Sequence, residues 1–172
     1  KKGKPLNIST GMGSKNEILK AVKTAIETGN KKILLLHCVS VYPANYKNLN
    51  LKTILWLKKN FKHLIGYSDH STSIEIPSFA SILGACLIEK HFTFNKKKSG
   101  NDHYHSMDLK DASLIIDQIN NTISNPDIMM DLPGNKIRVN KEISFVSGNT
   151  FKIFSSDLNY SEFIPLLSNG DI

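Results

Sequence analysis

The sequence has little or none of several features that mark special classes of protein. It contains two cysteines in 172 residues, and Cys38 and Cys86 lie in apolar runs without the spacing of a metal or redox site. No apolar run approaches the ~20 residues that a membrane helix needs. The sequence begins with Lys1 rather than Met and shows no signal peptide, so we expect a piece of a longer protein. We therefore expect a cytoplasmic protein with reduced core cysteines and no membrane contact.

Arginine is nearly absent as well. Arg138 is the single one, so that lysine supplies nearly all of the net charge of +7. We first interpret these lysines as residues on solvent-exposed faces of helices. The alternative is that they form a surface that binds nucleic acid. No RNP-type, zinc-finger or helix-turn-helix signature accompanies them. We therefore expect no nucleic-acid partner, and note that a moderately basic protein also suits an anionic small substrate.

Strand-like and helix-like segments alternate along the chain. The continuous apolar run KILLLHCV at residues 32–39 is typical of a parallel strand that is covered on both faces. A capping box formed by Ser14 and Glu17 begins the first helix, and Gly29 ends it. The pattern predicts strands near 4–10, 32–39, 63–67 and 85–91, and helices near 14–29, 49–60, 75–84 and 109–123.

Strict alternation with short connections indicates a parallel α/β sheet with right-handed crossovers. Polar residues after every strand favour a (β/α)8 TIM-type barrel, in which functional side chains collect at the carboxyl ends of strands. The alternative is a doubly wound open sheet, which usually binds its ligand at one switch point. Four units at residues 1–125 make half a barrel, and residues 126–172 are a tail or small extra element of unknown role. The polar clusters are Ser9-Thr10-Gly11, His37-Cys38, Ser68-Asp69-His70 and Glu89-Lys90-His91.

Two histidines, His70 and His91, end consecutive predicted strands and lie 21 residues apart. Adjacent parallel strands are ~4.8 Å apart, so both imidazoles can reach one ion. Glu89 precedes His91 by two residues and points to the same side of its strand. Such a set suits Mn²⁺, Zn²⁺ or Fe²⁺. The alternative is a pair of hydrogen-bonded core histidines.

Other candidates for a site lie in turns and loops. Small residues from Ser9 to Ser14 can aim backbone amides at an anion, and Ser68 can add a hydroxyl; a tight turn without a ligand is the alternative. Asp102, in a lysine-rich loop, can accept hydrogen bonds from a polar substrate or be solvated. For four side chains the sequence does not decide between a role in a site and an ordinary position in the core or a loop. These are His37, Tyr42, His103 and His105.

Taken together, these stretches resemble one family. The order of five segments is that of the sialic acid synthases, the N-acetylneuraminate synthase family, to which legionaminic and pseudaminic acid synthases also belong. The resemblance covers roughly residues 1–120. It implies that these residues correspond to the carboxyl-terminal half of the family's barrel domain, strands 5–8. The segments are KPLNISTGM (4–12), LLHCVSVYP (35–43), GYSDH (66–70), GACLIEKHFT (84–93) and GNDH (100–103).

The resemblance implies a metal-dependent enzyme that forms a carbon–carbon bond. In this family, phosphoenolpyruvate condenses with an N-acylated mannosamine-type sugar to give a nonulosonic acid and phosphate. By this resemblance, His70 and His91 would be the ligands of a divalent metal, usually Mn²⁺. Together with Glu89 they would be the catalytic residues.

The resemblance also implies where the two substrates bind. Ser9 and Ser68 would hold the phosphate of phosphoenolpyruvate. Tyr42, Glu89 and Asp102 would contact the sugar.

Three departures from the family pattern limit what this chain can do alone. The amino-terminal half of the barrel is missing, residues 131–172 do not resemble the family's antifreeze-like domain, and GNDHYHSMD differs from the common GPDH pattern. We expect the chain alone to be inactive, to need the missing half, and to form a homodimer when intact. The alternatives are a non-catalytic half-barrel subunit or truncated product that needs a partner chain, and a different metal-dependent, aldolase-like barrel.

Overall fold

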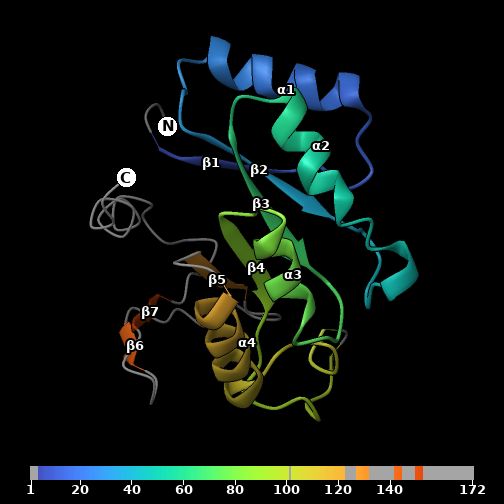
Figure 1. Ribbon diagram of the computed structural model, residues 1–172, viewed down its shortest axis with the longest axis vertical. Helices are drawn as coiled ribbons and strands as arrows, with labels where there is room; N and C mark the ends of the chain where they lie inside the picture. Colours follow the sequence, from blue (N-terminus) through green and yellow to red (C-terminus); the bar gives the residue numbers. More distant parts are fainter. Residues whose placement is uncertain (1–3, 101, 123–126, 132–141, 145–149, 153–172) are drawn as a thin grey trace.

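The computed structural model describes residues 4–100, 102–122, 127–131, 142–144 and 150–152. Helices and strands alternate through most of this part of the chain (Figure 1). They are β1 Leu6–Ser9, α1 Lys15–Glu27, β2 Ile33–Cys38, the 3-10 turn η1 Tyr46–Asn48, α2 Lys52–Asn60, β3 Leu64–Asp69, α3 Ile76–Ile82, β4 Leu87–His91, α4 Leu109–Thr122, β5 Asp127–Asp131, β6 Glu142–Ser144 and β7 Thr150–Lys152.

The main sheet has five parallel strands in the order β1-β2-β3-β4-β5. The predicted α/β class and the four strand–helix units are therefore confirmed. The sheet also continues past the expected boundary at residue 125, because β5 pairs with the outer edge of β4. The remaining pair, β6 and β7, is antiparallel.

A single apolar core joins the helices to one face of the sheet. In Figure 1, α1 and α2 lie toward the β1–β2 end of the sheet, and α3 and α4 lie near β4 and β5. The core includes Val22 of α1 and Ile119 of α4, together with Leu35 and Tyr67 from the strands. Because side chains alternate along a strand, the residues next to these core positions face away from the helices. That second face carries the candidate site.

The first helix begins as predicted. The Ser14 amide donates to Glu17 Oε2 over 2.8 Å, and the Glu17 amide donates to Ser14 Oγ over 3.4 Å, which completes the capping box. Gly29 follows the helix with φ of 86°, in the left-handed region that favours glycine. None of the described helices combines the length and apolar character that crossing a membrane would require.

Strand β3 runs two residues further than the sequence predicted, through Ser68 and Asp69. Asp69 faces the helices, where its side chain is 0% exposed and its Oδ2 lies 2.6 Å from Lys90 Nζ. The Tyr67 hydroxyl and the Ser71 amide also donate to this carboxylate. Two polar residues of the predicted strand-end clusters, Asp69 and Lys90, therefore form a buried ion pair that links β3 to β4.

Candidate functional site

Three of the predicted site residues meet where β3 and β4 end, on the face away from the helices. Ser68 lies directly opposite Glu89 in the strand register. Its Oγ donates to Glu89 Oε1 over 2.6 Å and is 3.3 Å from His70 Nε2. Strand pairing itself therefore brings together a hydroxyl, a carboxylate and an imidazole that are far apart in the sequence.

His70 is held in an orientation that suits a metal ligand. Its Nδ1 lies 2.7 Å from the carbonyl oxygen of Val39, which can only accept, so Nδ1–H is the donor. In the neutral ring, the lone pair is then on Nε2. The one hydroxyl hydrogen of Ser68 is already donated to Glu89, so this lone pair has no donor from Ser68. Metal-binding histidines usually have their other nitrogen bonded in this way, and His70 therefore fits the implied ion.

Aromatic rings gather around His70. The ring centroids of His70 and His91 are 5.6 Å apart, with the ring planes at 74°. Tyr42, on the loop after β2, lies with its ring centroid 4.1 Å from that of His70 and 5.6 Å from that of His91. The Ala44 amide donates to the His70 carbonyl over 2.8 Å and holds this loop in place.

The loop after β4 adds two further side chains to the cluster. One potential ligand atom from each of His91, Asp102 and His105 lies within 4.8 Å of the other two. His105 is buried, with its ring centroid 5.4 Å from that of His91. Burial lowers the pKa of the His105 imidazole and the neighbouring His91 lowers it further, whereas Asp102 acts in the opposite direction.

The sequence did not decide whether His105 belongs to a site. The signal that could have indicated this was the spacing Asp102-x-x-His105 on the loop that follows the strand ending at His91. His103, which the sequence also left open, has a structural role. Its Nδ1 lies 2.7 Å from the Thr93 hydroxyl, and both residues are buried. The two loop histidines therefore differ, because only His105 joins the imidazole cluster.

Ser9 lies apart from this cluster. It pairs with Leu36, whereas Ser68 pairs with Cys38, two residues further along β2. β1 and β3 are separated by β2, and hence by about 10 Å. Ser9 is exposed on the same face as Ser68, but the structure does not bring the two hydroxyls together.

The turn after Ser9 uses most of its own backbone amides. The Gly11 amide donates to Cys38 Sγ over 3.3 Å, the Gly13 amide to the Thr10 carbonyl over 2.8 Å, and the Ser14 amide to Glu17. These amides stabilise the turn and the start of α1. Little of the predicted anion-binding amide array is therefore open to a ligand.

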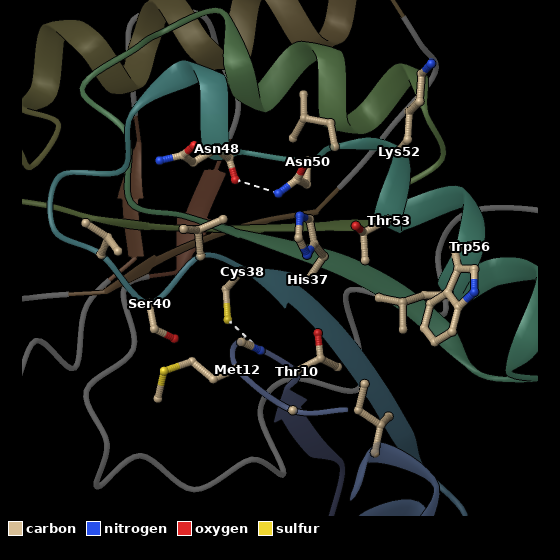
Figure 2. A pocket seen from close by; sticks show the side chains of 17 residues that line it. Thr10, Met12, His37, Cys38, Ser40, Asn48, Asn50, Lys52, Thr53 and Trp56 are labelled. Atoms are coloured by element: carbon tan, nitrogen blue, oxygen red, sulfur yellow. Dashed lines mark hydrogen bonds between the residues drawn. The ribbon is translucent and has the colours of Figure 1, made fainter. Parts of the chain in front are cut away.

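A cavity of about 720 Å³ lies beside the cluster, between this turn, the end of β2 and the start of α2 (Figure 2). Three polar side chains in its lining are bonded to backbone carbonyls: Thr10 Oγ1 to Leu36, His37 Nε2 to Leu49, and Asn50 Nδ2 to Asn48. None of the seven predicted site residues lines this cavity. The cavity is therefore separate from the imidazole cluster.

His37 is a core histidine, one of the two alternatives that the sequence left open. Its Nε2–H donates to the Leu49 carbonyl over 2.8 Å, and its ring centroid lies 5.6 Å from that of Tyr67 on the helix-facing side. Burial lowers its pKa below the ordinary value, and the hydrogen bond to Leu49 offsets only part of this effect.

This lowered pKa predicts a pH dependence of stability. Below about pH 6.5, unfolded His37 takes up a proton that the folded residue resists, so the free energy of unfolding should fall as the pH falls. His37→Gln removes this titration and keeps a donor for Leu49. Between about pH 7.5 and about pH 5.5 the wild-type chain should lose more stability than this variant in denaturant titrations. His63→Gln, at a half-buried position before β3, is the control, and equal losses in wild type and His37→Gln would refute the prediction.

Comparison with known proteins accounts for most of the chain. Residues 1–126 match the NeuB family. The N,N'-diacetyllegionaminic acid synthase of Campylobacter jejuni is 43% identical over 121 residues, which cover 69% of this chain and 36% of that enzyme. The chain spans about a third of the length of the curated relatives it matches.

Solved structures show the same relationship in three dimensions. The spore coat polysaccharide biosynthesis protein SpsE of Bacillus subtilis matches with a TM-score of 0.67 and 38% identity, over 69% of this chain and 34% of that one. The N-acetylneuraminic acid (sialic acid) synthetase of Leptospira borgpetersenii matches with a TM-score of 0.65 and 37% identity, over 69% and 41%. Because the family match extends from residue 1 to residue 126, this chain belongs to the NeuB family.

Proposed function

We propose that this chain supplies strands 5–8 of a (β/α)8 TIM-type barrel that acts as a nonulosonic acid synthase. The whole enzyme condenses phosphoenolpyruvate with an N-acylated mannosamine-type sugar and releases phosphate. Membership of the NeuB family and relatives named as legionaminic, pseudaminic and sialic acid synthases support this proposal. The observation that carries it is the meeting of His70, His91 and Glu89 at the ends of β3 and β4.

His70 and His91 would hold a divalent metal, for which we propose Mn²⁺. The support is the orientation of His70, whose Nδ1–H is donated to Val39 and whose Nε2 carries the lone pair. When bound, such an ion supplies Lewis-acid polarisation of the open-chain sugar aldehyde. His91 is the last residue of β4 and His70 directly follows the adjacent strand β3, so the sheet sets their separation.

Glu89 and Ser68 would act together on phosphoenolpyruvate. C3 of phosphoenolpyruvate attacks the aldehyde carbon, water adds to C2, and phosphate leaves. Ser68 has a single hydroxyl hydrogen, which it donates to Glu89 in this structure. Turning that hydrogen toward the substrate phosphate would remove the Ser68 hydrogen bond from Glu89 Oε1, which would then accept a proton from the attacking water. Ser9, on β1, would be a second phosphate contact only if the completed site brings its hydroxyl closer to Ser68 than this structure does.

The sugar would lie over the imidazole cluster. Tyr42 is 48% exposed, and its ring covers His70, so it can pack against a sugar face. Half-buried Asp102 can accept hydrogen bonds from sugar hydroxyls. In the intact enzyme, the amino-terminal half of the barrel and a second copy in a homodimer would complete this site.

The test is a Mn²⁺ titration of the folded chain by electron spin resonance. We expect one bound ion per chain in the wild type, and an affinity at least about tenfold lower in His70→Ala, because a ligand is lost. His63→Gln is the control, and circular dichroism confirms that each variant is folded. Equal affinity in wild type and His70→Ala would remove His70 from the proposed centre. If the wild type binds no ion, the titration is repeated with the amino-terminal half supplied, and a second failure would refute the proposal.

A non-catalytic half-barrel subunit is the second candidate. The observation in its favour is that β1 pairs only with β2 among the described strands, which leaves one edge of the sheet for another chain. A completed barrel that folds and binds both substrates but releases no phosphate would favour this alternative.

A further inference from the structure

We propose that His105 is a metal ligand and that, with His91 and Asp102, it forms a two-histidine, one-carboxylate site for a divalent transition-metal ion within this chain. The inference rests on the proposed function only in that the site shares His91 with the proposed metal centre. It differs in using two side chains of the loop after β4 in addition to strand-end residues. Potential ligand atoms of the three residues already lie within 4.8 Å of one another.

The His105 side chain has no explanation in packing alone. It is 1% exposed, and neither ring nitrogen has a hydrogen-bond partner within the described part of the chain. The nearest acidic oxygen, Asp102 Oδ1, lies 4.0 Å from Nε2, which is too long for a hydrogen bond. Burying a polar group without a partner costs free energy. A cation between the imidazole and the Asp102 carboxylate would supply the partner that His105 lacks.

The loop is built so that His105 faces the end of β4. The Met107 amide donates to the His91 carbonyl over 2.8 Å, which returns the loop to the strand end. Within the loop, Ser106 Oγ donates to the Asp102 carbonyl over 2.6 Å. These bonds hold both loop residues near His91 before any ion binds, so little ordering is required on binding.

Two tyrosine rings enclose the imidazole. The ring centroid of Tyr104 is 4.9 Å from that of His105, and that of Tyr42 is 5.9 Å away. The Tyr104 hydroxyl also lies 3.4 Å from the Tyr42 carbonyl, at the long end of hydrogen-bond range. These two rings shield one side of the His105 imidazole from water. The polar groups offered to an ion are then those of His91, Asp102 and His105.

This ligand set predicts which ions bind. Imidazole nitrogens favour Zn²⁺, Co²⁺ and Ni²⁺ over Mg²⁺, which prefers oxygen ligands. If only His70 and His91 bind the ion, changes at His105 and Asp102 should leave its affinity unchanged. In the proposed site, changes at His105 and Asp102 should weaken ion binding. In the metal-bound state, Asp102 would be a ligand rather than a sugar contact.

The experiment is a Co²⁺ titration followed by its visible absorption and by calorimetry. It uses the complete chain, with the variants His105→Gln, Asp102→Asn, His70→Ala and the control His63→Gln. We expect His105→Gln and Asp102→Asn each to lower the affinity at least about tenfold and to change the Co²⁺ spectrum, and His63→Gln to match wild type.

A second variant guards against misfolding. His105→Leu fills the same space without an unpartnered polar group, so the metal-free chain should melt no lower than wild type. It should also lose the rise in melting temperature that Co²⁺ causes in wild type, because an ion stabilises only the folded state that binds it.

Each outcome separates this inference from the proposed function. Loss of binding in His105→Gln with normal binding in His70→Ala supports the inference and removes His70 from the proposed centre. Loss in His70→Ala with affinity within about twofold of wild type in His105→Gln overturns the inference and leaves the proposed function intact. Loss in both supports the inference that His105 is a ligand and keeps His70 as a further ligand of the same ion. Absence of binding by the folded wild-type chain overturns the inference, because this chain supplies all three ligands, whereas the proposed function can still be tested with the missing half.

Discussion

Replacing Lys90 by methionine should lower the free energy of unfolding by about 3–5 kcal/mol, the range for breaking a buried ion pair. Lys90 Nζ donates to Asp69 Oδ2 over 2.6 Å and to the Ser71 carbonyl, and the two charged side chains are 3% and 0% exposed. Methionine keeps much of the apolar stem but removes the charge. Among the described residues, the buried Asp69 carboxylate then keeps only the Tyr67 hydroxyl and the Ser71 amide as donors.

The double variant Asp69→Asn/Lys90→Met should recover most of this loss. A neutral amide has a smaller desolvation penalty, and its oxygen can still accept from Tyr67 and Ser71. Denaturant unfolding followed by circular dichroism measures both effects, with Lys59→Met at an exposed position of α2 as the control. A loss below about 1 kcal/mol in the single variant, or no recovery in the double variant, would contradict a structural role for the pair.

The second large effect is expected on catalysis. In a completed barrel, Glu89→Gln should lower kcat by about 10²–10⁴-fold, the usual contribution of a general base. Glutamine keeps the size of the side chain, and its oxygen can still accept from the Ser68 hydroxyl, whose Oγ lies 2.6 Å from Glu89 Oε1 in the wild type. An amide cannot take a proton from the attacking water. KM for phosphoenolpyruvate should change much less than kcat, because the phosphate contacts are retained.

The completed barrel can be made by fusing the amino-terminal barrel segment of the Campylobacter jejuni relative ahead of Pro5. Release of inorganic phosphate from phosphoenolpyruvate in the presence of the sugar measures activity. Asp117→Asn, at an exposed position of α4, is the matched control. A Glu89→Gln variant within about threefold of the parent would show that Glu89 only positions Ser68.

Local features of the fold were predictable from the sequence. The capping box of Ser14 and Glu17 spans four residues, so its hydrogen bonds depend on little beyond that segment. The continuous apolar run of β2 and the alternation of strands with helices specify a parallel α/β sheet in the same local way. The His70–Ser68–Glu89 group was also within reach, because consecutive parallel strands place their carboxyl ends together.

Other features depend on tertiary contacts. The sequence placed Asp69 and Lys90 among polar residues at strand ends, but strand register turns both toward the helices, where each satisfies the other. β5 lies beyond the boundary expected at residue 125, since whether a short segment becomes a strand depends on the free edge of β4.

The amino-acid sequence by itself determined the fold class, the family resemblance and the strand-end histidines, because these follow from residue periodicity and short motifs. Only the tertiary structure decided which histidines have which roles. His37 and His103 are bonded to Leu49 and Thr93, whereas His105 is buried beside His91 with both ring nitrogens lacking hydrogen-bond partners among the described residues. The physical reason is that the partner of a buried imidazole is set by the return path of a loop and the facing direction of a strand, and neither is encoded in local sequence.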